Sequence, residues 1–432
     1  MKRTIRRTIA TAGVVVTMLS GLAGCGNNSA DNTSAVKKDF APTLDTTKNV
    51  SLEIAGFMAN FESLDQVIND FNEYYPNVSI SYEQNSATKL AEYLDSNEYV
   101  DIFMTSNSNI QSSGDSDMYV LDRCVDLSKE NIDTDAIQSE MLSSCTVNGK
   151  LARIPMAKTM CGMVVNKTLL KNENIAIPQT YKEFMAACET LKNKGYTPIQ
   201  GSKVHAYSDM VLPMGMAIIG NSDELTSKYN MKDSSYAYGL KSVYERLDEI
   251  ITKGYTSYEV NSEYADDNYD KAILKFFEGN VPFWICNTES VSGMKKRESK
   301  SETYTANPFE YEFVNVPLGD NGVYVYEEPW NGFSVNNKSK NIDYAVEFLN
   351  FMCTEKEINK VAQIKGMPSV ANNSSDSRFD NAVNPSKVEK KYVYNGKIRD
   401  GITAIIANTA NRRGAGMYKN VNEAVEALKE VN

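Results

Sequence analysis

Histidine, tryptophan and long apolar runs are scarce in this sequence. His205 is the only histidine among 432 residues, which excludes a histidine-rich metal site, and we expect neither a metal nor an organic cofactor. No stretch after residue 24 is long and apolar enough to cross a membrane. Tyrosine, with 25 residues, far outnumbers the 2 tryptophans, which suits a wet, aromatic-lined cleft as well as ordinary strand surfaces.

The short motifs of several enzyme classes are also absent. The sequence contains no G-x-S-x-G, no HExxH, no P-loop and no G-x-G-x-x-G. Adjacent carboxylates occur at Glu327-Glu328 and Asp266-Asp267, and glycosidases work with paired carboxylates. Because neighbouring side chains point apart, we interpret both pairs as parts of an acidic surface. We therefore predict that the chain is not an enzyme.

The charge balance is acidic. The formal net charge is −11, and it falls to −15 without the first 24 residues, which carry four positive charges and no negative ones. Negative charge argues against nucleic acid and against an anionic membrane surface as partners. The remaining length, about 400 residues, exceeds one comfortable hydrophobic core and favours two domains.

Seven cysteines are present, and one of them, Cys25, belongs to the leader described next. The other six are Cys124, Cys145, Cys161, Cys188, Cys286 and Cys353. An even number permits disulfides outside the cell, but the spacings are wide and irregular and no CxxC occurs. We favour isolated buried thiols and leave their pairing open.

The first residues have the layout of a secretory leader, with a basic start, a short apolar run and small residues before a cysteine. Leu22-Ala23-Gly24-Cys25 resembles the lipobox of bacterial lipoproteins. This resemblance implies that residues 1–24 are a removed signal peptide and that the Cys25 thiol is acylated, although a plain signal peptide with a chance cysteine is the alternative. Two or more acyl chains would hold the protein stably on a membrane. Residues 25–48 are polar and read as a flexible tether, so we expect order to begin near Val50.

Residues 50–104 predict a parallel α/β layer. Apolar residues alternate over 50–54 and 78–82, which predicts two strands, and 99–104 reads as a third. A helical repeat lies between the first two strands, and a short helix precedes the third. Capping boxes at Ser63, Thr180 and Thr354 predict three helix starts. Ligands of such sheets bind at the carboxyl ends of the strands, here the loops at 56–62 and 105–109.

Several separated stretches resemble one family, the extracellular solute-binding proteins of ABC importers, in the sugar-binding group that includes maltose-binding protein. The stretches, in order, are Phe71–Pro76, Val100–Ile102, Asp126–Ser128, Gly149–Lys167, Pro178–Phe184, Phe277–Phe283, Trp330–Val335, Ala345–Phe351 and Gly366–Pro368. Two positions depart from the family, which usually has tyrosine at Val165 and a tryptophan near Glu289. The solute specificity can therefore differ from that of the known sugar binders.

The resemblance implies an α/β fold of the periplasmic-binding-protein type, with two α/β lobes, a hinge and a ligand cleft between the lobes. Residues 49–155 and 316–355 would form lobe one, and residues 156–315 and 356–432 would form lobe two. A sugar offers flat apolar faces and a rim of hydroxyls, which suit aromatic rings and polar side chains. The candidate ligand-binding residues are Asn60, Phe61, Glu62, Asn107, Asn109, Tyr207, Asp209, Asn287, Glu289, Trp330 and Asn331.

Several candidates have a structural alternative. Trp330 lies between Pro329 and Asn331-Gly332 rather than on an apolar stripe, so we favour a stacking platform over a core residue. Phe61 would instead staple the helix that follows it. The amides of Asn107 and Asn109 would instead cap their own turn, and Glu289 would instead cap the helix that follows it.

The resemblance implies a lipid-anchored receptor on the extracytoplasmic face of the cell membrane. It would bind a carbohydrate, by preference an oligosaccharide, as a monomer and deliver it to the transmembrane subunits of an ABC permease. The membrane would be contacted only through the anchor. The first alternative is the same fold serving a non-sugar solute or a sensor kinase, and a further one is a glycan-processing enzyme.

Overall fold

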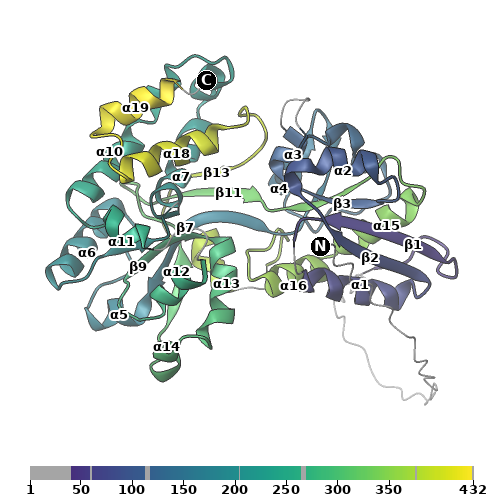
Figure 1. Ribbon diagram of the computed structural model, residues 1–432, viewed down its shortest axis with the longest axis horizontal. Coiled ribbons are helices and arrows are strands. Elements are labelled where there is room, and N and C mark those ends of the chain that lie inside the picture. The colour runs from purple at the N-terminus through teal and green to yellow at the C-terminus, as the bar shows by residue number, and fades with distance from the viewer. Residues whose placement is uncertain are drawn as a thin grey trace, which may run out of the picture.

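The chain folds into two α/β lobes that lie side by side (Figure 1). The computed structural model describes residues 40–58, 61–111, 117–203, 205–263, 269–374 and 377–430. Signal peptide, Cys25 and most of the tether therefore lie outside the described residues. Two separate sheets, each with helices packed against it, form the two lobes, which confirms the predicted fold class.

Lobe one, on the right in Figure 1, is built on a five-stranded sheet in the order β2-β1-β3-β12-β6. Its elements are β1 (Val50–Gly56), α1 (Glu62–Tyr74), β2 (Val78–Gln84), α2 (Leu90–Ser96), β3 (Ile102–Thr105), α3 (Asn107–Gln111), α4 (Ser139–Ser144), β4 (Thr146–Val147), β5 (Lys150–Leu151), β6 (Ile154–Pro155), β12 (Gly332–Val335), α15 (Ile342–Met352) and α16 (Glu355–Lys365). The first three strands are parallel, as predicted, and β12 runs antiparallel to β3.

Lobe two is built on a sheet in the order β13-β11-β7-β9-β8, and β10 also pairs with β7. Its strands are β7 (Lys158–Asn166), β8 (Ile199–Gly201), β9 (Phe283–Asn287), β10 (Tyr311–Val314), β11 (Val323–Pro329) and β13 (Val388–Val393). Its helices are α5 (Lys167–Asn172), α6 (Tyr181–Asn193), α7 (His205–Gly220), α8 (Asp223–Asn230), α9 (Tyr236–Gly239), α10 (Lys241–Thr252), α11 (Tyr258–Ser262), α12 (Tyr269–Phe276), α13 (Thr288–Glu298), α14 (Glu302–Ala306), α17 (Asp380–Val383), α18 (Ile402–Gly414) and α19 (Val421–Glu430).

Two of the three predicted N-cap residues cap their helices. The hydroxyls of Thr180 and Thr354 accept hydrogen bonds from the backbone N–H groups of Glu183 and Glu357, at 3.3 and 3.4 Å. The box predicted at Ser63 is wrong, because α1 already begins at Glu62 and the Ser63 side chain is buried within its first turn. A helix start can thus be recognised from the sequence while its first residue shifts by one or two positions.

The chain passes between the lobes three times. It leaves β6 at Pro155 and enters β7 at Lys158, and it returns between Pro329, the last residue of β11, and Gly332. The third passage lies between Ala371, in the core of lobe one, and Phe379, in the core of lobe two. A backbone hydrogen bond from Trp330 to Ala157 joins the first two passages, and one from Lys158 to Pro368 joins the first passage to the segment that precedes the third.

Two segments lie on the opposite side of the expected lobe boundaries. Strand β11, expected in lobe one, pairs with β7 and β13 in the sheet of lobe two. Helix α16, expected in lobe two, packs in the core of lobe one through Ile358 and Val361. In both cases long-range pairing decides the lobe, and the local sequence carries no sign of it.

The expectation that order begins near Val50 is wrong, because residues 40–49 already pack against lobe one. Phe40 is buried and packs edge-on against Tyr74 and Phe351, with ring centroids 5.2 and 5.0 Å apart. Three residues farther along the chain, the backbone N–H and the hydroxyl of Thr43 both donate to Glu347 of α15 at 2.8 Å. Residues 40–48 are therefore bound to lobe one by packing and hydrogen bonds and do not form part of a free tether.

We predict that Glu347→Ala lowers the free energy of unfolding by about 2–3 kcal/mol, because buried donors lose a charged acceptor. Glu347 is 2% exposed and also accepts from the Tyr75 hydroxyl, and burial together with this carboxylate raises the pKa of Tyr75 to about 12. Urea unfolding measures the loss. Asp343→Ala, which changes an exposed carboxylate on the same helix, is the matched control, and equal stabilities for the two variants would contradict the prediction.

Candidate functional site

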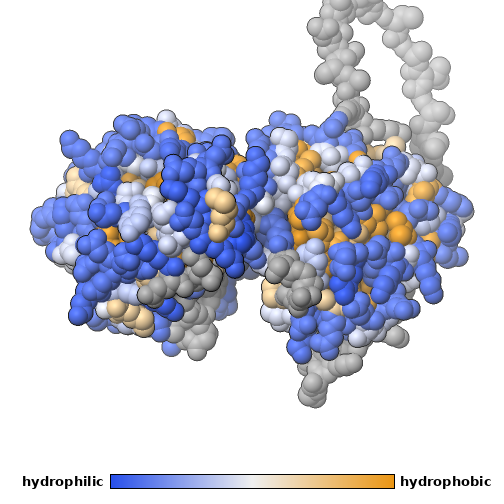
Figure 2. All heavy atoms as spheres, turned by 90° about the horizontal axis from the view of Figure 1, so that it is seen from above, coloured by the Kyte–Doolittle hydropathy of each residue, from blue (hydrophilic) through white to orange (hydrophobic). Residues whose placement is uncertain are grey.

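Polar side chains from both lobes come together beside the chain passages. In lobe one, α3 begins two residues after β3 ends; in lobe two, α7 follows β8 and α13 follows β9. Helices that start directly after strands place their first residues at the carboxyl edge of the sheet, where ligands of α/β layers bind. Viewed from above, the lobes form two separate masses with a furrow between them (Figure 2).

The centre of this region is a chain of hydrogen bonds through Asn107. Its amide oxygen accepts from the guanidinium of Arg153, and its amide nitrogen donates to Glu328 at 3.4 Å. Arg153 is fully buried and also donates to the Thr105 carbonyl at 3.0 Å. Because Asn107 and Arg153 belong to lobe one and Glu328 to β11, the chain of bonds joins the two lobes.

Glu328 is a partly exposed carboxyl group in dense surroundings. Burial raises its pKa above the usual value, and the negative charge of Glu289 acts in the same direction. Hydrogen bonding and positive charge oppose this shift: the Tyr326 hydroxyl donates to Glu328 at 2.8 Å, and Arg153 lies nearby. The carboxylate oxygens of Glu328 can accept a hydrogen bond from a bound hydroxyl.

A second carboxylate, Asp209 on the first turns of α7, lies close to the same point. It is buried, and its Oδ2 is 2.9 Å from Nδ1 of His205. Burial raises the pKa of the Cys161 thiol well above its usual value, with further contributions from Asp209 and Glu328. The Cys161 thiol thus lies within electrostatic reach of both carboxylates.

Trp330 is not an open stacking platform in this structure. Its side chain is 5% exposed and belongs to the core of lobe one, where the Phe61 ring meets it edge-on at 6.4 Å. Its indole N–H donates to Glu289 of α13 at 2.6 Å, so Trp330 also bridges the lobes. The predicted open ring is wrong because the short connection from β11 to β12 turns the indole into the core of lobe one.

Most of the other candidates have structural roles. Phe61 and Tyr207 are buried in the cores of lobe one and lobe two. Asn109 is fully buried and caps its own turn, accepting from the Ser106 backbone N–H at 2.9 Å. Asn287 caps α13 by accepting from Ser290 at 3.0 Å.

Three candidates remain to be placed. Glu62 is exposed at the start of α1, and its carboxylate lies 3.7 Å from Lys296 on α13 of the other lobe. Asn331 is partly buried between β11 and β12. Asn60 lies outside the described residues.

The roles of Arg153 and Glu328 are hard to recognise from the sequence. Arg153 is a single charge inside the apolar stretch Leu151–Pro155, and that interruption is the one sign of its role. The expectation that Glu327 and Glu328 belong to an acidic surface is wrong, because Glu327 is 1% exposed and pairs with Lys158. Asp266 and Asp267, the other pair, lie outside the described residues.

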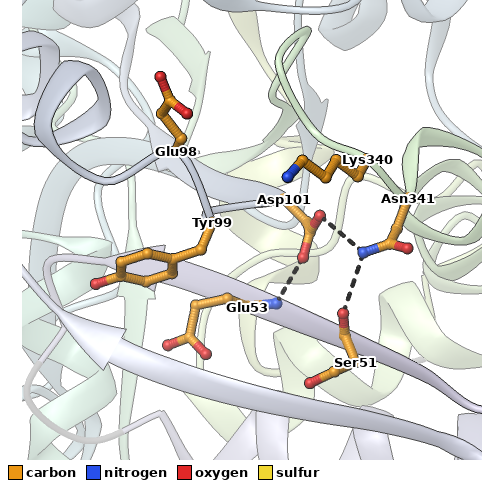
Figure 3. A pocket seen from close by; sticks show the side chains of 7 residues that line it. All are labelled: Ser51, Glu53, Glu98, Tyr99, Asp101, Lys340 and Asn341. Atoms are coloured by element: carbon orange, nitrogen blue, oxygen red, sulfur yellow. Dashed lines mark hydrogen bonds between the residues drawn. The ribbon is translucent and has the colours of Figure 1, made fainter.

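A shallow pocket of about 500 Å³ on lobe one is separate from this region (Figure 3). It is lined by Ser51 and Glu53 in the first half of β1 and by Asp101 just before β3, so it lies toward the amino edge of the sheet. Figure 3 shows the Asp101 carboxylate facing the Glu53 backbone N–H, at 2.9 Å, and the Asn341 amide, at 3.4 Å. Asp101 thus ties β1 and β3 to α15, which is a structural task.

Reactive and metal-binding groups are few in the part of the chain that the structure describes. The six cysteines there are all buried and unpaired, which confirms isolated thiols. Over those same ranges, no group of three or more histidine, cysteine or carboxylate side chains could hold a metal ion. Nor does any described helix combine the length and apolarity needed to cross a bilayer.

Comparison with known proteins gives a consistent result. The family model for the bacterial extracellular solute-binding protein matches residues 56–358. The Multiple sugar-binding protein of Streptococcus mutans is 24% identical over 229 residues, 51% of this chain and 52% of that protein. The chain thus spans about half the length of this curated relative.

Solved structures resemble the whole fold. The apo-form of RafE from Streptococcus pneumoniae is 15% identical, with a TM-score of 0.66 over 88% of this chain and 97% of that one. The GacH receptor of Streptomyces glaucescens is 14% identical, with a TM-score of 0.66 over 89% and 97%. A sugar transporter from Bacillus licheniformis, solved in complex with stachyose, is 17% identical, with a TM-score of 0.60 over 88% and 98%. These likenesses establish a shared two-lobe fold.

We predict that Glu328→Gln changes how stability depends on pH. A carboxyl group whose pKa is higher in the folded than in the unfolded state lets the folded protein bind more protons, so stability falls as pH rises from the usual value of 4.5 through the raised pKa. The amide introduced by Glu328→Gln cannot ionise, so the free energy of unfolding of the variant should decline less over this pH range than that of the wild type. Urea unfolding across that pH range measures it, with exposed Glu355→Gln as control. Parallel pH curves for Glu328→Gln and the wild type would contradict the prediction.

Proposed function

Because the chain belongs to the bacterial extracellular solute-binding proteins, we propose that it captures a carbohydrate outside the cytoplasm and delivers it to the permease subunits of an ABC importer. The observation that carries this proposal is the meeting of polar side chains from both lobes beside the chain passages. Similar proteins support the solute class: one relative is named for sugar binding, RafE was solved with raffinose, and GacH with acarbose.

The chemistry of the region suits a solute rich in hydroxyls. Asn107 provides a donor, while Asp209, Glu289 and Glu328 provide acceptors, so a hydroxyl can both give and receive a hydrogen bond. Arg153, which is fully buried, holds the Asn107 amide in place. These side chains come from α3, α7, α13, β11 and the segment before β6. A solute held between them contacts both lobes at once, and its binding energy favours the arrangement in which the lobes approach each other.

The family is one of solute-binding proteins, and we propose that this chain performs no covalent chemistry and acts as a monomer. Two carboxyl groups near one site would also serve a glycan-processing enzyme, and turnover of a glycan panel by the protein would favour that alternative. The alternative proposal keeps the fold and changes the task, to a non-sugar solute or to a sensor kinase. A solute panel separates the first of these from the main proposal.

We further propose that the mature protein is anchored to the outer face of the cell membrane through acylated Cys25. The basic start, the apolar run and Leu22-Ala23-Gly24-Cys25 support this reading, although all of them lie outside the described residues. The segment from Phe40 to Lys48 joins any anchor to lobe one. The membrane would then be a place of attachment and not a ligand.

We predict that at least one member of a panel of neutral oligosaccharides raises the melting temperature, since a solute that binds only the folded state stabilises it by about 2.7 kcal/mol at a hundred times its Kd. Asn107→Ala should weaken binding of that saccharide roughly tenfold, through loss of one or two hydrogen bonds. Exposed Asp343→Asn is the control. A panel in which only amino acids, peptides or polyamines shift the melting temperature would favour the non-sugar alternative.

We predict that Cys25→Ser abolishes membrane attachment or leaves the precursor unprocessed, because the thiol is the group that is acylated. Membrane fractionation and the mobility of the protein on a gel measure both effects. Cys353→Ser, which changes a buried thiol in lobe one, is the matched control for the loss of a cysteine. A processed Cys25→Ser protein that still sediments with membranes would exclude the anchor.

A further inference from the structure

Helix α13 of lobe two lies directly against lobe one. A Cβ atom on Gly366, at the end of α16, would lie 3.3 Å from the Cα atom of Ser292 on α13. Gly366 has a φ of +67°, in the left-handed region that glycine adopts most readily. Figure 1 shows the two helices facing each other beside the crossing strands. The contact is thus a close approach between the two lobes.

Charged and aromatic side chains fill this contact. The Trp330 indole donates to Glu289 at 2.6 Å, and the ammonium of Lys365 lies 5.2 Å from the Trp330 ring and 5.3 Å from the Phe61 ring. Farther out, Glu62 of α1 faces Lys296 of α13 at 3.7 Å. Burial lowers the pKa of Lys365, and the positive charge of Lys296 lowers it further.

The parts of this contact differ in strength. The pair Glu62–Lys296 is exposed and screened by solvent, so it contributes little. The Trp330 side chain is buried, and its N–H donates to the charged carboxylate of Glu289, which is itself exposed on α13. Hydrogen bonds to charged acceptors are among the stronger ones in proteins. A buried indole N–H that loses its acceptor also keeps an unsatisfied polar group. The bond to Glu289 is therefore the part of the contact whose loss matters most.

We propose that Glu62, Glu289, Lys296, Trp330 and Lys365 form an interlobe clasp that sets the angle between the lobes. Glu289 acts as the positioning residue: its carboxylate pins α13 to Trp330, which lies in the core of lobe one. Any rotation of the lobes about the chain passages shifts α13 relative to Trp330, so the clasp has to break or slide for the lobes to move. The inference rests on the proposed function for its purpose, the control of solute capture, but not for its test.

The clasp can be tested through its own tryptophan. Trp284→Phe leaves Trp330 as the single tryptophan, so fluorescence then reports on the clasp alone. In this background Trp330 should be poorly quenched by acrylamide, because it is 5% exposed. Glu289→Ala should increase the quenching constant several-fold, and Glu289→Gln, which keeps an acceptor oxygen, should give an intermediate value. Equal quenching in the parent and in Glu289→Ala would overturn the proposal.

Lys295→Ala is the matched control, since this side chain is on the same helix and 75% exposed, and its variant should match the parent. If Trp284→Phe impairs folding, small-angle scattering of the chain with both tryptophans replaces fluorescence. Glu289→Ala should then change the radius of gyration, and profiles that superpose on the wild type would overturn the clasp.

Neither measurement needs a saccharide, so the clasp and the proposed function fail separately. If Glu289→Ala exposes Trp330 while no saccharide binds the wild type, the clasp stands and the proposed function fails. If a saccharide binds and Trp330 stays equally shielded in Glu289→Ala, the clasp fails and the proposed function stands.

Discussion

A buried ion pair between Lys158 and Glu327 fixes the place where the two lobes meet. Both side chains are 1% exposed, and their charged atoms are 3.3 Å apart at the junction of β7 and β11. Buried charges are tolerated only when they are paired and hydrogen-bonded, and removal of one partner leaves the other uncompensated. Gln138 of lobe one accepts from Lys158 at 3.1 Å, while Lys391 of β13 pairs with Glu327 at 3.1 Å. The pair therefore ties a passage between the lobes to residues on both sides of it.

The candidate site depends on this junction. Glu328 follows Glu327 on β11, and Trp330 lies two residues farther along, so the register that places the ion pair also places both of these side chains. Successive residues of a strand point to opposite faces, which separates the buried pair of Glu327 from the partly exposed carboxyl group of Glu328. One short segment thus contains the buried charge of Glu327, the candidate binding residue Glu328, and Trp330, which bonds to α13.

The sequence predicts the architecture better than it predicts the site. Alternation and capping signals identify the first parallel strands and the helices after Thr180 and Thr354, because these are local properties of the chain. The lobe of β11 is set by its pairing with β7 and β13, and that of α16 by its packing against α1, which no local pattern encodes. The same limit applies to Arg153, which gains its meaning only when Asn107 and Glu328 are brought beside it. Conversely, some residues stand where binding residues usually stand, after strands or at helix starts, but have structural roles. Phe61 and Tyr207 pack in the cores, and Asn109 caps its own turn.

The six buried cysteines have a consequence for the chemistry of the protein surface. Burial raises the pKa of each thiol, well above the usual value for Cys161 and Cys286, so little of the nucleophilic thiolate forms. Oxidants and alkylating reagents act on accessible thiolates, and the described part of the chain offers them none. The fold can therefore persist in oxidising surroundings without forming disulfides, and a cysteine introduced on its surface would be the position that a thiol-specific dye labels first.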